Sequence, residues 1–359
     1  MSYLHFLKSP LDRQIGTPRE YILDKLEILE KNMPKFATFG ETMVQYNAKY
    51  LGPYNPKGDH ISDVAGAESN VALNLSRITS GSVHALWISR LGNDEAGKLI
   101  ADTLSQVIDI SAPIRDREKT GISFLNHYDD DSHIKEYQRA GSAASNLSFE
   151  DVESHLPGSD LFHVTGITPA LSASCRDATL KSMKRCLELN IPVCLDVNYR
   201  DQLWNPDEAK TVLNKMIGLS TVLKLGHDEA EAIWSEGRSA EEYARSFHQG
   251  SGTVTILTKG ASGAILFDGE NLIEEPSIEV RVVDPVGAGD AFVAGFIGTL
   301  FNDESTPRVA LSQSPEKRKV IFERAIRVAN ICGSLTCTKR GDTSAMPNMA
   351  EVEHYLGGT

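Results

Sequence analysis

The chain has 359 residues, 41% of them hydrophobic and 24% charged, which is ordinary for a globular protein with a sizeable core. Its formal net charge of −13 argues against non-specific binding to nucleic acid or to a membrane, since both surfaces are anionic. The five cysteines show no C-x-x-C pair and no metal-ligand spacing, which favours reduced thiols. Without a signal-peptide core or an apolar run long enough to span a bilayer, we expect a cytoplasmic protein.

The first 35 residues carry no motif and are interpreted as an N-terminal extension of unknown role. Residues 19–32 have the pattern of an amphipathic helix. A docked arm, an oligomer contact and a disordered tail all remain open.

Strands alternate with helical patterns from residue 70 onward, which predicts an α/β fold built on a doubly wound, mostly parallel sheet. The segments 42–64 and 120–139 do not fit this alternation. Residues 120–139 contain two alternating runs around a polar stretch, 129–132, which predicts a β-hairpin. Residues 42–64 are polar and turn-rich, and both segments interrupt the alternation of strands and helices.

Several predicted strands end in polar residues, at the edge where open α/β sheets bind ligands. A first strand, 36–39, leads to Glu41, which we interpret as a ligand contact or a solvated loop residue. A loop then enters a helix at Gly66, and Asn70 stands in the first helical turns. Its amide offers both a donor and an acceptor, although a plain helical role remains an alternative.

The most informative stretch is 283–297, where a β-like run, 278–283, is expected to lead through a glycine turn into a helix. Gly287 and Gly289 permit a tight turn and close approach of a ligand. The first amides of the helix point at this turn and suit an anion. Asp290 is then placed as a base beside an anion site, a combination that suits phosphoryl transfer. The competing interpretation makes Asp290 an N-cap.

Residues 284–292 read Asp-x-x-Gly-Ala-Gly-Asp-Ala-Phe and resemble the second signature of the ribokinase-like, or PfkB, family of sugar kinases. The resemblance covers about residues 36–350. It implies a kinase domain over 36–355, with segments 42–64 and 120–139 as a β-sheet lid above the sugar site. It also implies that Asp290 is the general base and that the amides of Gly287, Ala288 and Gly289 form the anion hole.

Within the family, residues 137–144 resemble the Tyr-x-Arg-x-x-Ser-Ala-Ala run of 2-keto-3-deoxygluconate kinases. Arg139 can grip a carboxylate with two parallel hydrogen bonds, and sugar acids carry a carboxylate while plain sugars do not. A solvated strand arginine is the alternative. The resemblance assigns the following residues to the sugar and to the transferred phosphoryl group: Glu41, Gly66, Asn70, Tyr137, Arg139, Asn198 and Arg200.

The resemblance also implies a nucleotide site that binds ATP with Mg²⁺. Its expected residues are Lys224, Lys259, Gly260, Gly263 and Asn330. Glu229 is expected to act on Mg²⁺ through water, but Gly226 stands where many family members have Asn, which weakens this metal assignment.

We therefore expect an ATP-dependent kinase that phosphorylates the terminal hydroxyl of 2-keto-3-deoxygluconate or a similar sugar acid. A fructokinase or other neutral-sugar kinase is one alternative, and a non-catalytic sugar-binding regulator on the same fold is another. The expected partners are the sugar acid, ATP and a second copy of the chain paired through the lid.

Overall fold

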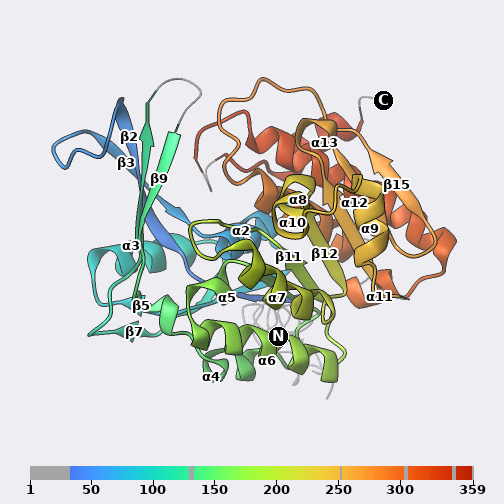
Figure 1. The fold of residues 1–359 in the computed structure, drawn as a ribbon, viewed down its shortest axis with the longest axis horizontal. Coiled ribbons are helices and arrows are strands. Elements are labelled where there is room, and N and C mark those ends of the chain that lie inside the picture. The colour runs from blue at the N-terminus through green and yellow to red at the C-terminus, as the bar shows by residue number, and fades with distance from the viewer. Residues whose placement is uncertain (1–32, 129–132, 251–252, 303–305, 342–344, 358–359) are drawn as a thin grey trace, which may run out of the picture. The chain divides into compact units, whose positions relative to one another are not determined.

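The computed structural model describes residues 33–128, 133–250, 253–302, 306–341 and 345–357 (Figure 1). The predicted helix at 19–32 lies outside the described residues, as does the polar turn at 129–132. None of the described helices is long and apolar enough to cross a membrane.

A nine-stranded sheet forms the centre, in the order β15-β14-β13-β12-β11-β10-β1-β4-β6. Its strands from β13 to β6 pair in parallel, and β14 and β15 are antiparallel. The bounds are β1 Lys35–Phe39, β4 His84–Ile88, β6 Asp109–Ser111, β10 Leu161–Thr165, β11 Val193–Asp196, β12 Val222–Gly226, β13 Val254–Thr258, β14 Ala264–Phe267 and β15 Leu272–Glu275. The central strands are nearly continuous apolar runs because helices cover both faces.

Alternate residues of the strands enter two different hydrophobic clusters, one on each face of the sheet. One face packs against α2 Ala67–Ile78, α10 Ala288–Asn302, α11 Pro307–Leu311 and α12 Pro315–Thr336. The other packs against α4 Phe149–Val152, α6 Ala173–Glu188, α7 Pro206–Ile217, α8 His227–Trp234 and α9 Ala240–Phe247. The described elements also include α3 Glu95–Leu104, α5 Thr168–Leu171, α13 Met349–Leu356 and the short pair β5 Leu91–Gly92 and β7 Ile114–Arg115.

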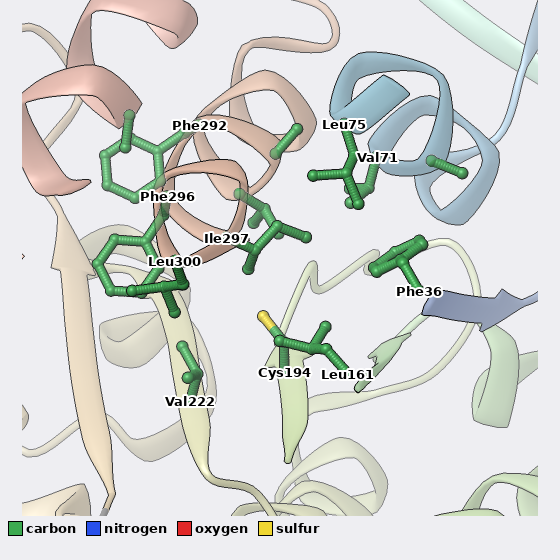
Figure 2. Packing of buried hydrophobic residues seen from close by; sticks show 14 of the residues in the cluster. Phe36, Val71, Leu75, Leu161, Cys194, Val222, Phe292, Phe296, Ile297 and Leu300 are labelled. Carbon is green, nitrogen blue, oxygen red and sulfur yellow. The ribbon is translucent and has the colours of Figure 1, made fainter. Parts of the chain in front are cut away.

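Helix α10 is apolar on all sides because it lies between α2, α12 and the sheet (Figure 2). Phe296, Ile297 and Leu300 pack in this layer. Gly295 and Gly298 allow the close approach of the neighbouring helices. A Cβ at Gly295 would lie 2.9 Å from the Cys332 sulfur, and one at Gly298 would lie 3.1 Å from Ile78. The core thus fixes the position of the helix whose first turn carries Asp290.

A separate four-stranded sheet, here called the small sheet, has the order β3-β2-β8-β9 and stands beside the main sheet in Figure 1. Its strands are β2 Met43–Leu51, β3 His60–Ala65, β8 Ile122–His127 and β9 His133–Gln138. Strands β8 and β9 pair antiparallel, as the predicted hairpin requires. The predicted fold class, a doubly wound sheet with a smaller β-sheet, is confirmed.

The predicted strand at 278–283 is wrong. This segment forms no strand; it runs along the end of α12, where the amides of Val283 and Asp284 donate to the carbonyl of Cys337 at 2.7 and 3.1 Å. Val282 and Val283 are 61% and 48% exposed. The β-branched residues give the segment strand propensity, but no neighbouring strand is available to pair with it.

Candidate active site

Two cavities lie on either side of the first turn of α10. The larger, about 510 Å³, is lined by Ala288 and Gly289, by the segment 277–282 and by residues of α12. The smaller, about 80 Å³, is lined by Gly287 and Asp290 and by residues of the small sheet. Residues of this turn therefore contribute to the walls of both cavities.

Asp290 lies in the first turn of α10 rather than at its N-cap, because the helix begins at Ala288. Its side chain is 8% exposed. The amide of Asn70 donates to Oδ2 at 2.8 Å, and that of Asn198 donates to Oδ1 at 3.4 Å. The amide oxygens of both asparagines are buried and find no partner among the described residues. These two oxygens can accept a hydrogen bond from a ligand hydroxyl beside the carboxylate.

Backbone geometry at the turn suits an anion. Gly287 has φ of +79°, which places it in the left-handed region that favours glycine. The first-turn amides of α10 have no intrahelical partner, although Ala288 N already donates to Pro285 O over a long 3.3 Å. A Cβ at Gly289 would lie 3.2 Å from the Lys224 ammonium. A buried cation therefore lies directly beneath the predicted anion hole.

Lys224 is held by a buried acidic network. Its Nζ donates to both oxygens of Asp196, at 3.0 and 3.1 Å. Burial disfavours the charged form of Lys224, but Asp196, Glu229 and Asp290 outweigh burial and raise its pKa. The lysine therefore stays charged, and its charge acts in a site of low dielectric.

Hydrogen bonds to the backbone account for the position of the Glu229 carboxylate without a bound metal ion. It forms a capping box at the start of α8, with one oxygen accepting from Gly226 N at 2.7 Å and the other from Tyr199 N at 2.6 Å. Burial raises its pKa, while Lys224 opposes the shift. Among the described residues, no group of three histidines, cysteines or acidic side chains could hold a metal ion. The Lys224 ammonium, rather than a metal ion, faces these carboxylates in the structure.

Arg139 lies at the wall of the small cavity in an ion pair with Glu41. Nε of the arginine donates to Glu41 Oε2 at 2.6 Å, and Ser142 donates to the other oxygen of Glu41. The guanidinium also lies over the ring of Tyr137, 5.4 Å from its centroid. Glu41 thus lines the cavity with both carboxylate oxygens already accepting protein hydrogen bonds.

Five other predicted residues line one of the two cavities. Gly66 and Arg200 line the small cavity, where Arg200 is exposed and donates to Tyr199 O at 2.9 Å. Gly260, Gly263 and Asn330 line the large cavity. The two glycines have φ of +54° and +86°, in the positive-φ region that favours glycine.

Lys224 and Lys259 do not line the large cavity. Lys224 is directed to Asp196, and Lys259 pairs with Glu274 on β15. The structure therefore brings the predicted substrate residues together, but only three of the five predicted nucleotide residues.

Two further residues, Lys135 and Glu68, lie at or beside the site but are not among the residues that the resemblance assigns to ligands, although Glu68 stands in a run that resembles a family segment. Lys135 lines the small cavity, and its spacing of two from Tyr137 along a strand could have indicated this. Glu68 lies behind Gly40 with its carboxyl group buried, and both Thr165 and Thr168 donate to its Oε1 at 2.6 Å. These threonines lie about a hundred positions from Glu68 in the chain, so no local sequence pattern predicts that the three side chains are in contact.

Residues 33–349 match the pfkB family carbohydrate kinase. The chain is 30% identical to a 2-dehydro-3-deoxygluconokinase from Bacillus subtilis over 89% of this chain and 94% of the relative. It is 26% identical to a probable fructokinase-2 from Arabidopsis thaliana, with the same coverage. A solved PfkB protein from a Polaromonas species superposes with a TM-score of 0.74 at 28% identity, over 89% of this chain and 99% of the other. The chain therefore belongs to the pfkB family of carbohydrate kinases and is a sugar kinase.

Proposed function

We propose that the protein is an ATP-dependent kinase that phosphorylates the terminal hydroxyl of 2-keto-3-deoxygluconate or a similar sugar acid. The observation that carries the proposal is the small cavity, whose walls include a buried carboxylate, Asp290, and a guanidinium, Arg139. A base and a carboxylate-binding group in one cavity suit a substrate that carries both a hydroxyl and a carboxylate.

Asp290 accepts the proton of the terminal hydroxyl as the hydroxyl oxygen attacks the γ-phosphorus of ATP. The bond from that phosphorus to the β–γ bridging oxygen breaks, and ADP leaves with the electron pair. Asn70 and Asn198 orient the carboxylate of Asp290 through the hydrogen bonds described above. The amides of Gly287, Ala288 and Gly289, the buried charge of Lys224 and the exposed guanidinium of Arg200 stabilise the charge on the phosphoryl group.

The large cavity is the proposed ATP site. Its volume of about 510 Å³ and its walls from Ile278, Val280, Val282 and Phe292 suit a flat base. Asn330 lines it with its Nδ2 already donating to Glu275 O at 2.9 Å, which leaves its amide oxygen as the acceptor. Gly260 and Gly263 permit backbone contact with ribose or phosphate, and Lys259 is proposed as a mobile cation at the rim. Mg²⁺ is proposed to enter with the nucleotide phosphates, and Glu229 would reach it only through water.

Substrate class depends on Arg139. A neutral sugar offers no carboxylate to this buried guanidinium. A sugar acid supplies a carboxylate that can accept hydrogen bonds from it. The higher identity to a 2-dehydro-3-deoxygluconokinase than to a fructokinase supports the same choice. A fructokinase remains the second candidate because that similarity covers as much of the chain.

The test is ADP release by the purified protein with 2-keto-3-deoxygluconate and with fructose, for wild type, Arg139→Ala and Arg139→Lys. Losing a hydrogen bond to a charged group costs about 1.5–3 kcal/mol, roughly a ten- to more than hundredfold loss in kcat/KM. We expect Arg139→Ala to lose this much on the sugar acid and little on fructose. Lysine should fall between, because it cannot form the bidentate pair.

Arg117, which is exposed in the loop before β8, supplies the control variant Arg117→Ala, expected to behave as wild type. Equal losses on both substrates would assign Arg139 to the support of the small sheet and favour the fructokinase. Absence of ADP release on every sugar and sugar acid would favour the non-catalytic alternative.

A further inference from the structure

Glu41 presents a conflict with the proposed substrate, because a carboxylate lines the cavity that would take a carboxylate. Its side chain is fully buried and that of its partner Arg139 is 9% exposed. Two buried anions facing the same cation would repel each other, so simple electrostatics predicts that Glu41 weakens the binding of a sugar acid. The geometry of the pair indicates the opposite.

Glu41 contacts the guanidinium at Nε, with a distance of 2.6 Å to Oε2. Nη1 and Nη2 form no hydrogen bond that is found among the described residues. A guanidinium presents five N–H groups in a planar fork, so a bond at Nε leaves the Nη groups for a second carboxylate. The ring of Tyr137, with its centroid 5.4 Å from the guanidinium carbon, further restricts the plane of the fork.

Glu41 is itself held in place from two sides. Ser142 donates to Oε1, and the backbone of Gly121 approaches so closely that a Cβ there would lie 2.5 Å from the same oxygen. The three residues come from the loop after β1, the start of β8 and the loop after β9. Glu41 therefore links the small sheet to the main sheet at the point where Arg139 faces the cavity.

Burying a lone guanidinium is costly, and fixing a long side chain on ligand binding costs conformational entropy. A partner that is already in place lowers both costs before the substrate arrives. We propose that Glu41 is a positioning residue that holds Arg139 in its carboxylate-binding pose, and so strengthens the binding of an anionic substrate although it is an anion. This inference rests on the proposed function, since it concerns the same site.

The test is Glu41→Gln, which removes the charge but keeps the size and one acceptor oxygen. We expect kcat/KM for 2-keto-3-deoxygluconate to fall on the order of tenfold, mainly through KM, with kcat/KM for fructose little changed. In an Arg139→Ala background, Glu41→Gln should cause no further loss, because Glu41 helps the sugar acid only through the arginine and without it is an unpaired buried anion. Ser142→Ala, which loosens Glu41 but keeps the ion pair, should cause a smaller loss in the same direction.

Glu136 provides the matched control. It is exposed on the same strand as Lys135 and Tyr137 but does not line the cavity, so Glu136→Gln removes a nearby negative charge without touching the pair. Thermal unfolding of each variant checks folding. If Glu41→Gln does not fold, Glu41→Asp and Ser142→Ala carry the test with the same expected order of losses.

Each other outcome has a definite meaning. Tighter binding of the sugar acid by Glu41→Gln would show that repulsion dominates and overturn the proposal. Equal losses on both substrates, or a loss that persists in the Arg139→Ala background, would also overturn it, since Glu41 would then act on the sugar directly. A wild-type enzyme that prefers fructose refutes the proposed function instead, and that result is read from the wild type alone.

Discussion

At the scale of single residues, the site depends on contacts between side chains that lie far apart in the chain. The turn from Gly287 to Asp290 lies where its motif predicts, at the start of a buried helix. The ion pair between Glu41 and Arg139 joins positions 98 residues apart, so no local pattern could show it. Likewise, the resemblance assigns Lys224 to the nucleotide, and only the fold shows that its ammonium pairs with Asp196 close to Gly289.

The variant Asp290→Asn tests whether Asp290 acts as the general base. General-base catalysis typically contributes about 10²- to 10⁴-fold, so we expect turnover to fall by this factor or more. Asparagine keeps an oxygen that can accept from Asn70, so folding and ATP binding should survive. Turnover under saturating substrates and calorimetric ATP binding measure the two effects.

Asp177, an exposed aspartate in α6 that pairs with Lys181, gives the charge-matched control Asp177→Asn, expected to keep wild-type turnover. Near wild-type turnover in Asp290→Asn would remove this carboxylate from the mechanism.

At the scale of elements, periodicity predicted the alternating strands and helices and the β8–β9 hairpin because each follows from local pattern. The segment 278–283 was mispredicted because strand formation also needs a partner, and partners are decided by the fold. Glu68 in the first turn of α2 shows the same limit: an acidic residue near a helix N-terminus is ordinary, yet here it is 1% exposed and packed against Gly40.

Glu68 predicts a pH dependence of stability. Burial raises its pKa, while hydrogen bonds from Thr165 and Thr168 oppose the shift. A carboxyl group with a raised pKa in the folded state keeps a proton that the unfolded chain has released. Its contribution is therefore complete below the unfolded pKa of about 4.3 and is lost as the pH rises through the folded pKa.

Glu68→Gln stays neutral at every pH and keeps the oxygen that accepts from the two threonines. We expect the free energy of unfolding of this variant to increase relative to that of wild type as the pH rises from 5 to 8, so that the variant becomes the more stable of the two. Urea unfolding at several pH values measures the difference, with the exposed Glu136→Gln as control. A difference that is the same at all pH values would mean that Glu68 is ionised in the folded protein.

At the scale of the described chain from residue 33 onward, the site is assembled from distant parts. The base comes from α10, its amide partners from α2 and the loop after β11, and the guanidinium from the end of β9. The family resemblance predicted that these parts meet, and local pattern alone did not. The small sheet contributes Tyr137 and Lys135 to the cavity, and no strand of the described residues pairs with the outer side of β3 or β9.

The small sheet also carries the expected contact between two copies of the chain. Leu51 on β2 and Ile61 on β3 are 68% and 55% exposed. Strand register places both on the face that includes Leu125: Ile61 lies opposite Asn47, which lies opposite Leu125, and Leu51 lies opposite His127. Exposed apolar residues beside unpaired strand edges are unfavourable in water and favour a partner with the same surface.

We therefore expect the purified protein to sediment as a dimer at micromolar concentration and Ile61→Asp to shift it towards monomer. Burying an isoleucine side chain is worth about 1.5–3 kcal/mol, and a symmetric dimer buries it twice, so the dissociation constant should rise more than a hundredfold. Leu187 on α6 is 62% exposed and supplies the control Leu187→Asp, which should leave the dimer intact.

Sedimentation of wild type as a monomer, or an equal shift in both variants, would show that the small sheet does not pair two copies. An intact dimer in Ile61→Asp would place the contact on another surface. The cavity residues Tyr137 and Lys135 belong to the small sheet, and with the contact elsewhere association would not reach them. Activity measured across the same concentration range would then be independent of association.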